Sequence, residues 1–238
     1  MDGSEFDIIA EGVTKSFGNI HALRGIDLRV NKGEFLTIFG PNGAGKTTLI
    51  RLLATLTKPT SGKVTIANHD AKKDPDKVRA LIGVISHDPY LYESLSALEN
   101  IKFFASLYGV SQPNGKAIEV IKQVGLEGRM HDLVRTFSRG MRQRLAVARA
   151  IVHEPKILLL DEPYTGLDQD GIRIFGKMLS WLKEQGRTII MTTHNFHEGF
   201  EIGDRVAIID GGKIIYESDA REVGLTRFKE IYFEKVGD

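Results

Sequence analysis

One run of eight residues, Gly40-Pro41-Asn42-Gly43-Ala44-Gly45-Lys46-Thr47, constrains the fold of this chain more than any other feature. It matches G-x-x-x-x-G-K-[ST], in which the glycines let the backbone wrap closely around an anion with its N–H groups pointing inward. An apolar segment at residues 35–39 precedes the run, and helical spacing of leucines follows it. The N-terminal end of a helix attracts phosphate. The order strand, glycine loop, helix therefore predicts an α/β protein with a phosphate-binding loop.

The side chains of this loop have separate expected roles. We expect Lys46 to reach the β- and γ-phosphates of a nucleotide and the Thr47 hydroxyl to ligate Mg²⁺. The predicted nucleotide-binding residues are Gly40, Pro41, Asn42, Gly43, Ala44, Gly45, Lys46, Thr47 and Thr48.

Two carboxylates follow a second buried strand. Apolar residues 157–160 run directly into Asp161 and Glu162. By themselves, adjacent acids at a strand end could equally form a solvated turn. In a chain that also carries a phosphate loop, we favour Asp161 as a Mg²⁺ ligand acting through water, and Glu162 as the group that polarises the attacking water.

Patterns along the rest of the chain favour a mostly parallel sheet with helices on both faces. Short strands with turns are expected over residues 8–33, and a helical insertion over residues 88–150. Within the insertion, Ser96 and Glu99 form a capping box, and the predicted helix turns Leu98, Ile101, Phe104 and Leu107 inward. A last helix is expected to pack on the domain through residues 225–236.

Composition narrows the possible functions. The chain of 238 residues has no cysteine, so a disulfide framework, a thiolate zinc site and a cysteine nucleophile are excluded. Its net charge of +1 does not favour nucleic acid. The longest strongly apolar runs fall far short of the ~20 residues that span a bilayer, and we find no signal peptide. We therefore expect a cytosolic globular protein that meets a membrane only through a partner.

A third segment, Phe137-Ser138-Arg139-Gly140-Met141, precedes a helical pattern and could present a second helix N-terminus to an anion. Together with the phosphate loop and the acidic strand end, it resembles the nucleotide-binding subunit of an ATP-binding cassette (ABC) transporter. The likeness covers residue 8 to about residue 217. It implies an ABC ATPase core with an antiparallel N-terminal β subdomain and an inserted α-helical subdomain.

In that family, a Ser-Gly-Gly-Gln signature contacts the γ-phosphate of ATP held by the opposite subunit. The resemblance places Ser138 and Gly140 in those roles. Arg139 replaces the first signature glycine, and Met141 replaces the glutamine. We expect Arg139 either to add a charge near phosphate or to lie in solvent.

Further family positions follow from the same resemblance. Phe17 matches the aromatic residue that stacks on adenine, although a core position is the alternative. Asp168 matches the loop that links the two ATP sites, and His194 matches the histidine that contacts the γ-phosphate and orients water. His87 stands where the family has a glutamine that ligates Mg²⁺ and senses the membrane subunit. An imidazole is a poorer ligand for a hard metal than an amide oxygen.

The resemblance also implies domains and partners. We expect one ABC ATPase domain over residues 7–238, with its nucleotide-binding core at 7–87 and 151–238 and its helical subdomain at 88–150. Residues 1–6 are a suspected vector scar, because Gly3-Ser4-Glu5-Phe6 is what two common cloning sites encode; a native terminus is the alternative. The membrane subunit is expected to dock on residues 90–108, with at least half of Phe103, Phe104 and Tyr108 packed inward.

The predicted function is ATP hydrolysis that drives transport, with export favoured. Two identical chains would sandwich two ATP molecules head to tail, at the cytoplasmic face of the membrane. Residues 161–166 and 86–88 look similar to the ATPases of haem exporters and of other small two-gene exporters.

Two alternative functions fit the sequence less well. A non-transport ABC ATPase of DNA repair or translation is disfavoured by the short gap between the phosphate loop and the signature, the single cassette and the balanced charge. A nucleotide kinase or GTPase leaves the Ser138 segment unexplained, and the chain has no Asn-Lys-x-Asp sequence.

Overall fold

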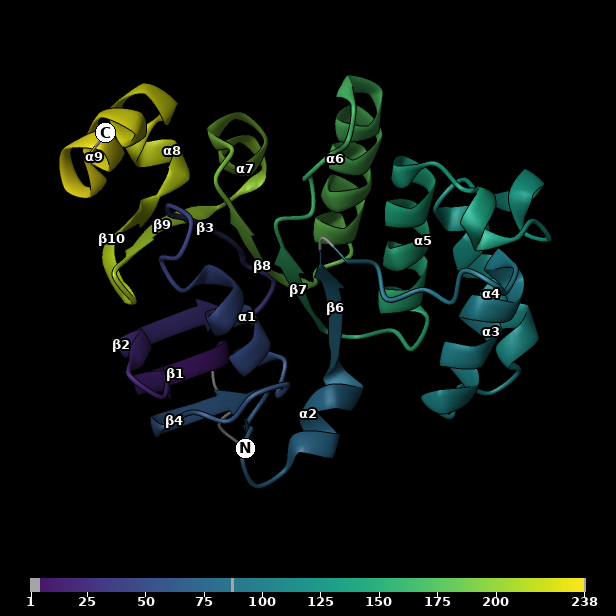
Figure 1. Ribbon diagram of the computed structural model, residues 1–238, viewed down its shortest axis with the longest axis horizontal. Coiled ribbons are helices and arrows are strands. Elements are labelled where there is room, and N and C mark those ends of the chain that lie inside the picture. The colour runs from purple at the N-terminus through teal and green to yellow at the C-terminus, as the bar shows by residue number, and fades with distance from the viewer. Residues whose placement is uncertain (1–4, 87, 238) are drawn as a thin grey trace.

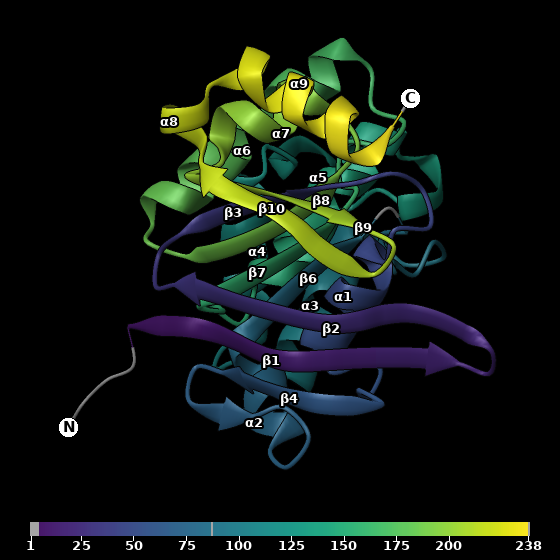
Figure 2. The ribbon, with the colours of Figure 1, turned by 90° about the vertical axis from the view of Figure 1, so that its left-hand side faces the viewer.

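The computed structural model describes residues 5–86 and 88–237 (Figure 1). Its first sheet is antiparallel and has the strand order β2-β1-β4-β5. The four strands are β1 (Phe6–Phe17), β2 (Ile20–Asn31), β4 (Ser61–Ile66) and β5 (His69–Asp70). Short strands were expected over residues 8–33, but β1 and β2 each run for 12 residues and form one long hairpin (Figure 2). Register shifts along the pair accommodate this length.

The second sheet has the order β10-β9-β3-β8-β7-β6. Five neighbouring strands are parallel, and only β10 runs antiparallel, against β9. The strands are β3 (Phe35–Phe39), β6 (Ile82–Ser86), β7 (Ile157–Asp161), β8 (Thr188–Thr193), β9 (Arg205–Asp210) and β10 (Lys213–Asp219). The predicted mostly parallel sheet is therefore confirmed.

Helices cover both faces of this sheet. Close to it are α1 (Lys46–Leu53), α2 (Pro75–Leu81), α6 (Gln169–Glu184), α7 (Phe196–Ile202), α8 (Ala220–Val223) and α9 (Leu225–Val236). A group of helices gathers beyond the β6 edge in Figure 1, namely α3 (Ala97–Leu107), α4 (Pro113–Gln123) and α5 (Arg139–Ile151). Two 3₁₀ turns, Glu127–Arg129 and Val134–Thr136, connect α4 to α5.

Alternating residues of the central strands enter different core clusters. On β7, Leu158 and Leu160 join one cluster with the helices of the insertion, whereas Leu159 joins a second cluster with α1 and the antiparallel sheet. Every residue of β3, β7 and β8 is buried. Burial on both faces is the usual setting of parallel strands, and it explains why these sequences are mostly apolar, with threonine as the main polar residue.

The inward face of α3 is as predicted at Leu98, Ile101 and Phe104, which pack on the core, but not at Leu107. The capping box is present, since Ser96 accepts a hydrogen bond from the Glu99 amide, and the Glu99 carboxylate accepts one from the Ser96 amide. However, Leu107 is 69% exposed, and the fully buried positions include Ala97, Ile101 and Ala105. These residues recur every four positions, so the helix packs on its neighbours along that row and turns Leu107 away.

The aromatic side chains of this region are also more exposed than expected. Phe103 is 44% and Tyr108 42% exposed, and only Phe104 is half-buried against the core. The expectation that at least half of the three pack inward is therefore wrong. Tyr90 and Tyr92, which precede the helix, are each 50% exposed, so the aromatic surface extends beyond α3.

The C-terminal helix packs on the domain, as predicted. Phe228 of α9 is fully buried and lies against Phe39 at the end of β3, with ring centroids 5.0 Å apart. Phe196 of α7 stacks on the same Phe39 ring at 5.5 Å. Among the described residues, no helix has both the length and the apolar character that crossing a bilayer requires.

Candidate active site

The glycine loop connects β3 to α1 and is shaped by close backbone contacts. A Cβ on Gly40 would lie 2.2 Å from the carbonyl oxygen of Ile209 on the neighbouring strand β9. Gly45 has φ +108°, and a Cβ there would lie 2.6 Å from the Ala22 carbonyl oxygen. Both positions therefore require glycine, because the colliding atoms belong to backbone that cannot move aside cheaply.

Lys46 begins α1 and folds back over the loop. Its Nζ donates hydrogen bonds to the carbonyl oxygens of Gly40 at 2.7 Å and Pro41 at 3.1 Å, and it lies 3.3 Å from Oε1 of Glu162. The side chain is only 6% exposed. A buried ammonium needs such partners, and they place the positive charge at the centre of the loop.

Asp161 ends β7 beside the loop and is buried. It accepts a hydrogen bond from Oγ1 of Thr192 at 2.8 Å, across the parallel pair β7–β8 that sets these two residues opposite each other. Sequence reasoning missed Thr192. A partial signal was available, since threonines follow the apolar residues of β8, and a buried hydroxyl needs a hydrogen-bond partner.

Glu162 has a left-handed backbone, with φ +49°. Its Oε2 accepts a hydrogen bond from the His194 amide at 3.3 Å and lies 2.9 Å from His194 Nδ1, while its own amide donates to the Thr192 carbonyl at 3.0 Å. A non-glycine residue in this conformation is strained, and such strain persists where surrounding contacts hold it. The structure thus brings together three of the predicted residues, Lys46, Glu162 and His194.

The Ser138 segment forms a separate part of the surface. Ser138 caps α5 by accepting a hydrogen bond from the Met141 amide at 3.3 Å, and Asp168 caps α6 by accepting one from the Gly171 amide at 2.8 Å. A cavity of about 170 Å³ lies between them and is also lined by Gly140. Within the described part of the chain, no hydrogen bond or ion pair joins this segment to Lys46, Glu162 or His194.

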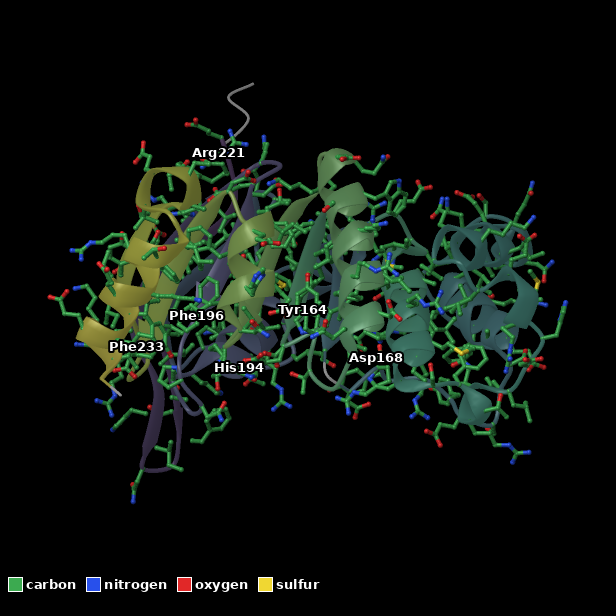
Figure 3. The ribbon with its side chains drawn as sticks, turned by 90° about the horizontal axis from the view of Figure 1, so that it is seen from above. Tyr164, Asp168, His194, Phe196, Arg221 and Phe233 are labelled. Atoms are coloured by element: carbon green, nitrogen blue, oxygen red, sulfur yellow. The ribbon has the colours of Figure 1, made fainter. Side chains whose placement is uncertain are left out.

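The two departures from the family signature differ in their surroundings. Met141 is half-buried and packs against the core cluster. Arg139 is exposed overall, but its guanidinium rests on Gly166, in the loop between Glu162 and Asp168. Figure 3 shows Asp168 and His194 along one edge of the molecule, on either side of Tyr164.

Phe17 lies at the end of β1 and is 52% exposed, so the alternative of a core position is wrong. The Lys15 Nζ lies 4.8 Å from the centroid of its ring. An exposed aromatic ring at this position is available to stack on a planar ligand. His87, the remaining predicted metal ligand, lies outside the described residues.

The oxygen donors at the site fit magnesium. Thr47 offers a hydroxyl and Asp161 a carboxylate, which are the hard ligands that Mg²⁺ prefers. Over residues 5–86 and 88–237 there is no cluster of three or more His, Asp or Glu side chains that could hold a metal alone. One or two protein ligands together with substrate phosphates is the usual arrangement for Mg²⁺.

Comparisons with known proteins agree with this geometry. A family model described as ABC transporter matches residues 23–165. The ATP-binding protein NatA of Bacillus subtilis (strain 168) is 39% identical over 200 residues, which cover 83% of this chain and 81% of that protein. The daunorubicin resistance ATP-binding protein DrrA3 of Streptomyces coeruleorubidus is 36% identical, covering 91% and 69%. The Nod factor export ATP-binding protein I of Cupriavidus pinatubonensis is 34% identical, covering 89% and 66%.

Solved structures are similar as well. The ATP-binding cassette MJ0796, solved as a dimer in a post-hydrolysis state with ADP and Pi, superposes with a TM-score of 0.81 at 30% identity, covering 90% of this chain and 99% of that one. CbiO1 from Clostridium perfringens, part of an ABC transporter complex, gives a TM-score of 0.84 at 28% identity, covering 98% and 96%.

Proposed function

Because this chain belongs to the ABC transporter family as an ATP-hydrolysing, ATP-binding subunit, we propose that it powers export through a separate membrane subunit by ATP-driven head-to-tail dimerisation. The observation that carries the proposal is the convergence of Lys46, Glu162 and His194 at the phosphate loop. Export is supported by relatives named for drug resistance and Nod factor export. The narrower likeness to haem exporters stays a prediction.

The residues at the loop divide the chemistry between them. Lys46 and the loop amides bind the β- and γ-phosphates, where positive charge stabilises the transferring phosphoryl group. Glu162 accepts a proton from the attacking water, and His194, 2.9 Å from its carboxylate, orients that carboxylate and contacts the γ-phosphate. Magnesium, when bound by Thr47 and Asp161, neutralises phosphate charge. Phe17 stacks on the adenine.

The second half of each ATP site comes from another copy of the chain. Ser138 and Gly140 lie apart from Lys46 within one chain, and they offer a capped helix N-terminus on an exposed surface. A head-to-tail dimer, the arrangement that family resemblance implies, brings this surface onto the γ-phosphate held by the partner and makes two equivalent sites. The dimeric solved cassette with ADP and Pi supports such an assembly.

The membrane subunit docks on an exposed aromatic surface, which we define as Tyr90, Tyr92, Phe103, Leu107 and Tyr108. Each of these side chains is at least 42% exposed. Contiguous apolar side chains on a surface mark interaction sites. The chain is thereby held at the cytoplasmic face of the membrane, with residues 88–150 as the subdomain that receives the partner and 7–87 with 151–238 as the ATP-binding core.

The experiment is a substitution of Glu162 by Gln, which preserves shape but removes the proton acceptor. We expect ATP hydrolysis by E162Q to fall by at least about a hundredfold, because general-base catalysis contributes roughly 10²–10⁴ in rate. The variant should accumulate as a dimer with ATP and remain a monomer with ADP, as measured by size-exclusion chromatography with light scattering. Glu184→Gln, an exposed acid on α6, is the matched control. An E162Q protein that stays monomeric at saturating ATP and hydrolyses it at the parental rate refutes the proposal.

A further inference from the structure

Arg139 makes an unusually close contact with the loop that follows Glu162. If Gly166 carried a Cβ, this atom would lie 2.5 Å from Cζ, 2.6 Å from Nε and 2.8 Å from Nη1 of Arg139. Three atoms of the guanidinium at nearly equal distances indicate that its flat face, rather than one N–H group, lies against Gly166. Independently of this contact, the backbone favours glycine at position 166, since its φ is +72°.

The contact is one of packing rather than charge. Arg139 forms no hydrogen bond or salt bridge with any described residue, so its N–H donors are not what holds it in place. A planar guanidinium packs well on a flat peptide surface, and the absence of a side chain on Gly166 lets it approach. Arg139 thereby connects the first turn of α5 to the loop from Glu162 to Asp168.

The loop beneath Arg139 is tightly folded. The Thr165 amide donates to the Glu162 carbonyl at 3.2 Å, and the Leu167 amide donates to the Tyr164 carbonyl at 3.1 Å. On the inner side, Tyr164 is buried and its ring lies 5.3 Å from that of Phe175 on α6. Tyr164 thus anchors the loop to the core, and Arg139 contacts the same loop at Gly166.

We propose that Arg139 is a positioning residue that braces the loop between Glu162 and Asp168 against the N-terminus of α5. This inference rests on the proposed function, in which Glu162 serves the ATP of its own chain and Ser138 serves the ATP of the partner. The brace joins these two elements within one chain. Through it, movement of the Ser138 segment on meeting a partner's phosphate is transmitted to the loop that begins at the general base.

The test is a double-mutant cycle on ATP hydrolysis by the full chain. Arg139→Ala should lower kcat about three- to tenfold and leave KM for ATP within about twofold, because small misplacements of catalytic groups reduce turnover. Gly166→Ala should lower kcat at least about fivefold more in the parental chain than in the R139A background, since the clash exists only where Arg139 is present. The backbone strain of alanine at φ +72° is common to both backgrounds and cancels.

Arg139→Lys separates packing from charge. A lysine keeps the positive charge but has no flat face, so R139K should resemble R139A rather than the parent. Arg135→Ala, an exposed arginine four residues earlier, is the matched control and should keep the parental kcat. The proposal is wrong if the reductions in kcat caused by R139A and G166A simply multiply in the double variant. It is also wrong if R139K keeps the parental kcat. If E162Q fails to dimerise with ATP, the proposed function has failed instead, and the two failures are distinguishable.

Discussion

Truncating Phe228 tests how much the packing of the C-terminal helix beside the phosphate loop contributes to the stability of the fold. Phe228 is fully buried, and its ring lies 5.0 Å from that of Phe39, the residue that immediately precedes Gly40. The ring of Phe196, two residues after His194, lies 6.1 Å from Phe228 and stacks on Phe39, so the three rings form one cluster. Phe228→Ala therefore opens a cavity next to the end of β3, which leads into the phosphate loop, and next to the segment that follows β8 and carries His194.

The expected loss of stability follows from this burial. A buried aromatic side chain removes about 150–250 Å² from water, which at about 25 cal/mol per Å² corresponds to about 4–6 kcal/mol. Measured Phe→Ala substitutions in cores cost about 3–5 kcal/mol. We expect a decrease of about 4 kcal/mol in the free energy of unfolding, and a fall in Tm of about 8–16 °C for a chain of this size.

Urea unfolding followed by circular dichroism measures this change, with the midpoint shifted and the slope unaltered. Phe233→Ala is the matched control, because Phe233 lies on the same helix (Figure 3) but is 49% exposed. It should cost less than about 1 kcal/mol. If F228A is no less stable than F233A, then α9 is not part of the cooperative fold, and the reasoning from burial is wrong.

Two further predictions concern the docking surface and the pH dependence of stability. Leu107→Glu should abolish co-purification with the membrane subunit while Leu56→Glu, an equally exposed leucine elsewhere, does not; equal losses would argue against the surface. Burial lowers the pKa of His153 from 6.5, aided by repulsion from Arg187 and Arg149 and opposed by the hydrogen bond to the Ile82 carbonyl. The unfolded chain therefore binds the proton more readily, so stability present above about pH 6.5 is lost on acidification. Between about pH 7.5 and 5.5, the urea midpoint should fall less in His153→Gln than in the parental protein. An equal fall of the midpoint in both proteins would contradict this.

The local elements that have strong signals were predictable from the sequence. The glycine loop, the apolar segments before Gly40 and Asp161, and the capping box at Ser96 each depend on residues that are near neighbours in the chain. Periodicity alone was less reliable on α3. It correctly indicated Leu98, Ile101 and Phe104, but it failed at Leu107 and did not indicate the fully buried alanines Ala97 and Ala105.

Contacts between distant segments were not predictable. Thr192 supports Asp161 only because β7 and β8 lie side by side in one register. The position of Arg139 depends on the left-handed turn at Gly166, which no spacing rule reports. Such pairs are set by tertiary packing, which local propensity does not encode.

The full burial of β3, β7 and β8 has a practical consequence for anyone who wishes to redesign this ATPase. Substitutions inside these strands disturb packing on two sides at once, so a library directed at them will yield mostly unfolded protein. The loops at the strand ends are better targets, because diversity there can change nucleotide preference or turnover while the scaffold remains intact, provided that Gly40 and Gly45 are kept.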